Sequence, residues 1–231
     1  MILHAGGLED DMSRREGRIR LLGIVVGLCA LAATGGAPKA AAQEDLDARV
    51  RAFLEANKGQ WRDLNVPAVD GQTLYDIVLE NRYTRALEIG TSTGHSGIWI
   101  AWALSKTGGK LITIDLDERR HRQAVANFAA AGLSKYIDAR LGNAHDLVPA
   151  LPGPFDFVFS DADKDWYKNY LIAVLPKLEV GGCYATHNVS AGGRQRSGGD
   201  DYLAYLQSLP NLQTTVDSRG SGMAISYKRA K

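Results

Sequence analysis

Residues 85–115 read "RALEIGTSTGHSGIWIAWALSKTGGKLITID", and this stretch decides the fold. An apolar run over 85–90 ends in Gly90 and predicts a buried strand. Residues 95–106 have the apolar spacing of a helix, and 110–115 form a second apolar run that ends in Asp115. A strand, a helix and a strand joined by short turns predict a unit whose two strands lie parallel.

The same alternation continues along the chain. Further strands are predicted at 136–142, 155–161, 181–188, 212–218 and 222–229, and further helices at 44–58, 70–82, 117–132, 166–178 and 200–210. This order predicts an α/β protein with a Rossmann-like fold, in which a mostly parallel seven-stranded sheet carries helices on both faces.

Composition limits the class of protein. The chain has 231 residues, of which 45% are hydrophobic and 23% charged, as expected for a soluble globular domain. Its net charge of +1 argues against a nucleic-acid partner, which usually selects a strongly basic surface. Two cysteines provide no disulfide framework, and we expect Cys183 to be a small buried residue of a strand.

The N-terminus has the segment order of a secretory signal. A basic stretch (12–20), an apolar run (21–33) and a segment of small residues follow one another. Ala40-Ala41-Ala42 fits an A-x-A cleavage site. We therefore expect 1–42 to be a signal peptide or N-terminal anchor, and 43–231 to be a single domain that is exported or periplasmic. A membrane-anchored or cytoplasmic location is the alternative.

Polar residues collect where the predicted strands end. Gly90, Asp115, Asp161 and the pair His187-Asn188 each close one strand. In open α/β sheets, ligands bind outside the carboxyl ends of the strands. We therefore expect these residues to border one site.

The turn after the first strand indicates the ligand. "EIGTSTGHSG" (88–97) lets the backbone approach a ligand, but its glycines do not have the G-x-G-x-x-G spacing of a dinucleotide site. Asp115 ends the next strand, where an acid either accepts both hydroxyls of a ribose or caps the following helix. A nucleoside without a pyrophosphate fits both features, and S-adenosylmethionine is such a ligand.

Four segments resemble the cation-dependent O-methyltransferases of the catechol and caffeoyl-CoA type. They are "ALEIGTSTGHSGIWIAWAL" (86–104), "GGKLITIDLDERR" (108–120), "FDFVFSDADKDWYKNY" (155–170) and "GGCYATHNV" (181–189). The resemblance runs from Val66 to Asn188, and "DADK" followed by "Y..NY" is its most specific part. It implies a class I methyltransferase fold, an S-adenosylmethionine donor and a small-molecule acceptor with a catechol-like or other vicinal oxygen pair.

The resemblance also implies which residues hold the donor. Glu88 and Gly90 would bind its amino-acid end, Ser96 its carboxylate, Asp115 the ribose hydroxyls and Ala144 the adenine through its backbone. The full set that matches donor-contacting positions is Val66, Glu88, Gly90, Thr91, Ser96, Asp115, Ala144 and Asp163.

A divalent cation and a base are implied as well. Asp161, His187 and Asn188 match the metal ligands, and Lys164 matches the base near the acceptor hydroxyl. A bound cation acidifies a hydroxyl and fixes its position, and it favours the neutral, proton-accepting form of a nearby lysine.

One position departs from the family pattern, which has Asp-Asn where this chain has His187-Asn188. Mg²⁺ prefers an all-oxygen shell, whereas a site with one imidazole suits Mn²⁺, Fe²⁺, Co²⁺ or Zn²⁺. Three interpretations stay open: a metal site retuned from Mg²⁺, a metal-free enzyme in which His187 acts as acid or base, and a histidine without a catalytic role.

Two other functions compete with the methyltransferase. An exported relative that binds a nucleoside without turnover would explain His187 and the signal, but not the retained Asp161 and Lys164. An NAD-dependent oxidoreductase is disfavoured by the glycine spacing. A homodimer, with the helix at 44–58 packed on a partner, is a further expectation.

Overall fold

The computed structural model describes residues 37–190 and 199–230. One seven-stranded sheet has the order β3-β2-β1-β4-β5-β7-β6. The strands are β1 (Arg85–Ile89), β2 (Lys110–Asp115), β3 (Ile137–Leu141), β4 (Phe155–Ser160), β5 (Leu178–His187), β6 (Leu212–Asp217) and β7 (Met223–Lys228). Strands β1 to β5 pair in parallel, and β7 runs antiparallel to β5 and β6. The predicted mostly parallel α/β sheet is confirmed.

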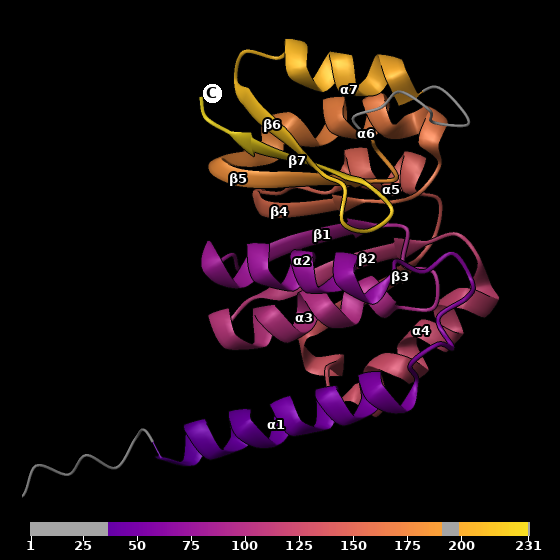
Figure 1. Ribbon diagram of the computed structural model, residues 1–231, viewed down its shortest axis with the longest axis vertical. Coiled ribbons are helices and arrows are strands. Elements are labelled where there is room, and N and C mark those ends of the chain that lie inside the picture. Colours follow the sequence, from indigo (N-terminus) through magenta and orange to yellow (C-terminus); the bar gives the residue numbers. More distant parts are fainter. Residues whose placement is uncertain (1–36, 191–198, 231) are drawn as a thin grey trace, which may run out of the picture. The chain divides into compact units, whose positions relative to one another are not determined.

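Helices cover both faces of this sheet (Figure 1). They are α1 (Ala37–Ala56), α2 (Ala68–Glu80), α3 (His95–Thr107), α4 (Glu118–Ala131), α5 (Ala144–Ala150), α6 (Tyr167–Val174) and α7 (Gly199–Ser208), with short 3-10 turns η1 (Ser134–Tyr136), η2 (Lys164–Trp166) and η3 (Leu175–Lys177). Figure 1 shows α1 lying outside α3 and α4, and these helices share a buried cluster around Phe128 and Val50.

Strand β4 lies at the centre of the sheet and shows why two layers of helices are needed. All six of its residues are buried. Phe157 and Phe159 pack with α2 and α3, whereas Val158 packs with α6 and α7. Successive side chains of a strand point to opposite faces, so a strand with apolar residues on both faces requires cover on both. Cys183 in the neighbouring β5 is a buried free cysteine, as predicted.

Three helices show the main differences from the prediction. Helix α1 begins at Ala37 rather than 44, because the alanines that fit a cleavage site are also strong helix formers. The helix predicted over 166–178 is α6 between two 3-10 turns, the second of which contains Pro176. Helix α5 was not predicted; it is short and contains Pro149, and the Asn143 side chain caps it by accepting the His145 amide at 3.0 Å.

The N-terminal signal or anchor predicted for 1–42 lies mostly outside the described residues. Within the described part of the chain, no helix is long and apolar enough to cross a membrane. The division into signal and domain at Gln43 therefore stays a prediction.

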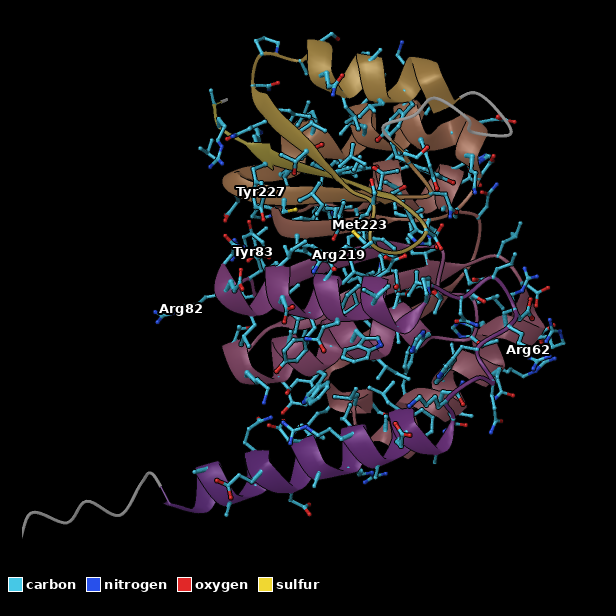
Figure 2. All side chains as sticks on the ribbon, viewed as in Figure 1. Arg62, Arg82, Tyr83, Arg219, Met223 and Tyr227 are labelled. Carbon is cyan, nitrogen blue, oxygen red and sulfur yellow. The ribbon has the colours of Figure 1, made fainter. Side chains whose placement is uncertain are left out.

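The β6–β7 hairpin is tied to α2, which matters for the site below. The Arg219 guanidinium donates to Asp217 and to Thr73 on α2, at 2.6 and 3.1 Å. Figure 2 shows Arg219 and Met223 beside this helix. The Arg219 hydrogen bonds outweigh the opposing effect of burial and lower the pKa of Asp217 to about 2.

Candidate functional site

A cavity of about 860 Å³ opens where β1, β2, β4 and β5 end. Eight of the twelve predicted site residues line it: Gly90, Asp115, Ala144, Asp161, Asp163, Lys164, His187 and Asn188. The volume lies in the range of cofactor and ligand pockets. Four predicted residues lie elsewhere: Val66 lines a second cavity, and Glu88, Thr91 and Ser96 are buried and do not line the first.

The glycine turn brings two strand ends together. Gly90 has φ of +98°, and a Cβ there would lie 2.8 Å from the Asp161 carbonyl oxygen. The turn is fixed further by the Ser92 amide, which donates to Asp115 at 2.7 Å. Glycine at 90 therefore permits the ends of β1 and β4 to meet at the wall of the cavity.

Asp115 does not cap the following helix, which was one of the two functions that the sequence left open. Its carboxylate oxygens accept from the Ser92 and Asp117 amides at 2.7 and 2.8 Å. The neighbouring Asp117, not Asp115, caps α4 by accepting from Arg120. A carboxylate has about four acceptor sites, so Asp115 retains capacity for ribose hydroxyls.

Ala144 and Asp163 both line the cavity, and His145 links them. The Asp163 carboxylate lies 2.8 Å from His145 Nε2, and the His145 ring stacks on Trp166 at 3.5 Å. Asp163 has φ of +48°, an unusual value for a residue with a side chain. His145 thus links α5, where an adenine would lie, to the turn after β4.

Glu88 is the most perturbed acid of the region. It is fully buried, accepts from Thr113 at 2.5 Å, and has an Oε1 atom without a hydrogen-bond partner among the described residues. Burial outweighs the Ser96 and Thr113 hydrogen bonds and raises the pKa of Glu88 to about 8. A buried, unpaired carboxylate oxygen is costly unless a donor group binds it.

His187 lies between two carboxylates. Its Nε2 is 2.8 Å from Asp70 Oδ2, and its Nδ1 is 3.1 Å from Asp161 Oδ2. Burial lowers the pKa of His187, but Asp161 and Asp70 together outweigh that effect and raise it. The Nδ1 contact lacks hydrogen-bond direction, so this buried nitrogen has no hydrogen-bond partner in the described structure.

Lys164 and Asn188 close the same end of the cavity. Lys164 Nζ donates to Asn188 Oδ1 at 2.7 Å. Five non-glycine residues in the described ranges have a positive φ. Four of them line the cavity, namely Leu64, Ser92, Asp163 and Asn188, and the fifth is Arg82. Such backbone strain concentrates at functional sites.

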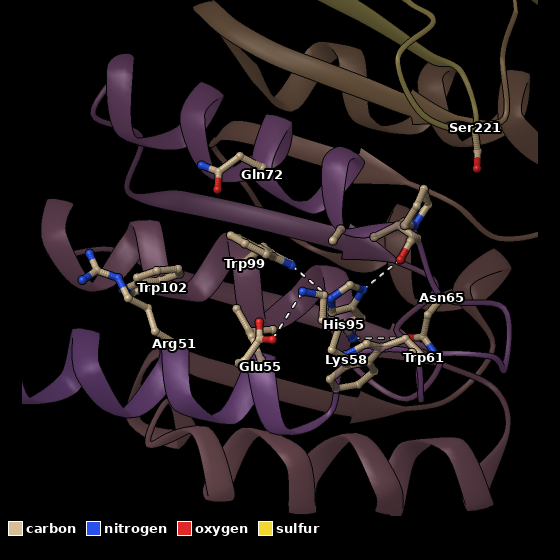
Figure 3. Close-up of a pocket in the computed structure, with 15 residues that line it drawn as sticks. Arg51, Glu55, Lys58, Trp61, Asn65, Gln72, His95, Trp99, Trp102 and Ser221 are labelled. Atoms are coloured by element: carbon tan, nitrogen blue, oxygen red, sulfur yellow. Dashed lines mark hydrogen bonds and ion pairs between the residues drawn. The ribbon is translucent and has the colours of Figure 1, made fainter.

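A second cavity of about 900 Å³ adjoins the first and shares Asn65 and Ser221 with it. Figure 3 shows His95, Trp99 and Trp102 along α3, facing charged side chains of α1. Trp61 stacks on His95 with ring centroids 4.5 Å apart, and Trp99 Nε1 donates to His95 Nε2 at 3.1 Å. Burial lowers the pKa of His95, so the ring belongs to an uncharged aromatic wall.

Asp70 and Ser221 were not predicted as site residues. They contact each other through the Ser221 amide, which donates to Asp70 Oδ2 at 3.0 Å. The only signal for Asp70 in the sequence was an acid in the first turn of a helix, which ordinarily indicates a helix-dipole partner. Leu116, directly after Asp115, also lines the cavity and was not predicted.

No group of three or more His, Cys, Asp or Glu side chains in the described ranges is arranged to hold a metal ion. A site built on Asp161 and His187 would take its third protein ligand from an amide, that of Asn188. The predicted metal ligands are thus adjacent, but metal binding itself stays a prediction.

A family model for O-methyltransferases matches residues 40–219, most of the chain. The chain belongs to this family. Among curated members, the catechol O-methyltransferase of Niastella koreensis is 39% identical over 112 residues, which are 47% of this chain and 50% of that protein. Caffeoyl-CoA O-methyltransferase 1 of Eucalyptus globulus is 32% identical over 136 residues, covering 57% of this chain and 55% of that protein. The chain spans about half the length of these curated relatives.

Solved structures of the family share the fold. The crystal structure of the O-methyltransferase from Bacillus cereus in complex with SAH matches with a TM-score of 0.68 and 25% identity. The match covers 84% of this chain and 97% of that one. The class I methyltransferase fold and the catechol and caffeoyl-CoA type of family, both expected from the sequence, are confirmed.

Proposed function

We propose that the protein is an S-adenosylmethionine-dependent O-methyltransferase that acts on a hydroxyl group of a small molecule, with a catechol-like or other vicinal oxygen acceptor. One observation carries the proposal: the same cavity is lined by residues suited to binding a nucleoside and by residues suited to deprotonating a hydroxyl. The nucleoside would contact Gly90, Asp115 and Ala144. The hydroxyl would lie near Asp161, Lys164, His187 and Asn188.

Two features support the donor. Asp115 retains acceptor capacity for two ribose hydroxyls, and no basic phosphate-binding loop precedes α3. The unpaired Oε1 of Glu88 would accept a hydrogen bond from the ammonium of the donor's amino-acid end. The Bacillus cereus relative was solved with SAH, which is what this donor becomes after losing its methyl group.

A divalent cation fits the residues present. His187 Nδ1 is buried, lacks a hydrogen bond and lies 3.1 Å from Asp161 Oδ2. Two ligands of one ion, each about 2.1 Å from it, lie about 3 Å apart. Asp161, His187 and Asn188 would hold the cation, which would acidify the acceptor hydroxyl and fix its position. An imidazole in the set favours Mn²⁺ or Zn²⁺ over Mg²⁺.

Lys164 is the proposed base. Its Nζ lies 2.7 Å from Asn188 Oδ1, so it borders the same cluster and is in place to take the acceptor's proton. Methyl transfer from a sulfonium is an in-line displacement, so the oxygen must be deprotonated while it is held against the methyl group.

A metal-free mechanism is the second candidate. Asp70 holds His187 Nε2 in the way a carboxylate orients a catalytic histidine, leaving Nδ1 beside Asp161. A binding protein without turnover is the third. These candidates predict different responses to metal removal.

The test is an assay of the purified protein with S-adenosylmethionine and catechol, after chelation and then with Mg²⁺, Mn²⁺ or Zn²⁺. The metal-assisted enzyme should be inactive after chelation and most active with Mn²⁺ or Zn²⁺. Activity that survives chelation would favour His187 as the base. Donor binding without product under every condition would favour the non-catalytic relative.

Asp161→Asn gives a sharper test of the metal. The substitution keeps the shape of the side chain and removes the charge that faces His187, so metal stimulation should fall by about tenfold or more while donor binding is retained. Calorimetry with the donor and steady-state kinetics with the metal measure the two effects. Asp165→Asn, at an exposed neighbouring position, is the matched control. Unchanged metal stimulation in Asp161→Asn would contradict the assignment.

An aromatic acceptor is supported by the second cavity. Trp61, Trp99 and the uncharged His95 form its walls, and indole faces stack well on flat rings. The catechol and caffeoyl-CoA relatives carry the names of aromatic diols. In the assay above, catechol should therefore be a better acceptor than an aliphatic vicinal diol.

Export remains part of the proposal. Cleavage after Ala42 would remove the start of α1, and residues 40–42 are exposed or only partly covered. The Gln43 side chain, which would follow the cut, donates to Ser105 on α3 at 3.2 Å. N-terminal sequencing of the protein from a cell fraction should begin at Gln43; a chain that keeps its N-terminus would support an anchor or a cytoplasmic enzyme. Gel filtration of the same sample would test the proposed homodimer.

A further inference from the structure

We infer that Asp70 is a positioning residue, whose carboxylate fixes the His187 ring so that Nδ1 presents its lone pair beside Asp161. This inference rests on the metal-assisted function proposed above. It adds to the site a residue from α2, an element that precedes every strand of the sheet.

The hydrogen bonds around Asp70 define the proton on His187. Asp70 Oδ2 accepts from the Ser221 amide at 3.0 Å, so this oxygen acts as an acceptor. The same oxygen lies 2.8 Å from His187 Nε2, which must therefore carry the hydrogen. With the proton on Nε2, Nδ1 is the nitrogen that can bind a metal.

Packing holds this arrangement in place. Asp70 and His187 are 3% and 4% exposed. A Cβ on Gly220 would lie 1.7 Å from Asp70 Oδ1, so the hairpin backbone closes directly over the carboxylate. On the other side, the Tyr167 hydroxyl donates to the His187 carbonyl at 3.0 Å and holds the end of β5. The carboxylate and the ring consequently have little room to rotate apart.

A carboxylate behind a metal-binding histidine orients the ring and raises its basicity as a ligand. In this chain, His187 and Asp70 form such a pair across 117 residues of sequence. The pair explains how a histidine can bind the ion at a position where the family pattern has an aspartate. The negative charge that the aspartate would place on the ion comes instead from Asp70, which contacts the other nitrogen of the ring.

The test is a titration of Mn²⁺, followed by electron paramagnetic resonance, into the wild-type protein and Asp70→Asn. An asparagine keeps an oxygen that accepts from the Ser221 amide and from His187 Nε2, but it removes the negative charge behind the ring and so lowers the basicity of Nδ1 as a metal ligand. Mn²⁺ affinity should fall by about 10- to 100-fold, with donor affinity unchanged. Nitrogen-15 NMR of the metal-free wild type at alkaline pH should show the proton on Nε2 and a free lone pair on Nδ1.

Asp217→Asn is the matched control, because Asp217 anchors the same hairpin to α2 but does not contact His187. It should keep the wild-type Mn²⁺ affinity. Gly220→Ala is the second variant: its Cβ would displace the Asp70 carboxylate without changing the charge, and it should weaken Mn²⁺ binding as Asp70→Asn does.

Equal Mn²⁺ affinity in the wild type and Asp70→Asn would overturn the inference, as would an equal loss in Asp217→Asn. If Asp70→Asn does not fold, Gly220→Ala with wild-type affinity would overturn it too. A wild-type protein that methylates catechol without binding Mn²⁺ or Zn²⁺ would also overturn it while leaving the methyltransferase function standing. Absence of any methyl transfer would instead reject the proposed function.

Discussion

Replacing Lys164 with methionine should lower kcat for methyl transfer by about 10²- to 10⁴-fold, the usual contribution of a general base. Methionine keeps the length and stem of the side chain but cannot accept a proton. Since Lys164 is not among the residues proposed to hold the donor, the affinity for S-adenosylmethionine should change little. Steady-state kinetics and calorimetry with S-adenosylmethionine separate the two quantities.

The pH profile distinguishes a base from a merely structural lysine. The wild-type rate should rise with pH, whereas the Lys164→Met rate should follow the ionisation of the acceptor hydroxyl alone. Lys168→Met is the control, because Lys168 is exposed on α6 and lies over the Tyr205 ring, 4.2 Å from its centroid. If Lys164→Met kept a kcat near that of the wild type, Lys164 would not be the base, and His187 would be the remaining candidate.

Replacing Glu88 with glutamine should stabilise the free protein and weaken donor binding at the same time. Glutamine retains acceptors for Thr113 and Ser96 without the cost of a buried charge. The donor's ammonium would lose a charge-assisted hydrogen bond, which corresponds to about 10- to 100-fold in affinity. Chemical denaturation and calorimetric titration measure the two effects.

The gain in stability should depend on pH. The folded protein keeps the Glu88 proton up to a pKa of about 8, whereas the unfolded chain releases it near 4.5. Stability of the wild type therefore falls as the pH rises between these values. Glu88→Gln should be more stable by roughly 4 kcal/mol at pH 8, an order-of-magnitude figure, with the advantage vanishing below about pH 4.5.

Glu80→Gln, on the exposed end of α2, is the control for a lost carboxylate and should show no such pH-dependent gain. If Glu88→Gln bound the donor as tightly as the wild type, Glu88 would have no part in the donor site. A variant that is no more stable than the wild type at pH 8 would show that another group meets the buried Oε1.

The sheet could be predicted from the chain because its signals are local. Largely apolar strands such as 155–160 and 110–114 must be buried on two faces, and Gly90 permits a turn that a larger residue would block. Strand ends in a parallel sheet share one edge, so the order of residues along the chain was enough to place Asp115, Asp161 and His187 at one site.

Helix boundaries were predicted less well because they depend on competing short-range preferences. The alanines at 40–42 satisfy both a cleavage pattern and a helix, so the sequence alone did not show that the helix extends to Ala37. Helix α5 was missed because Pro149 argues against a helix, although it lies near the end of this short one.

The sequence by itself therefore determined the fold, the family and the group of polar residues at the carboxyl edge of the sheet. Only the tertiary structure decided how His187 is held, that Glu88 is buried with an unpaired oxygen, and that tryptophans of α3 line a cavity beside the site. These properties arise between residues far apart in the chain: Asp70 meets His187 because α2 and the β6–β7 hairpin pack across the end of β5. Spacing along the sequence specifies strands and turns, but the hydrogen-bond partner of a buried side chain is set by which surfaces the whole core brings together.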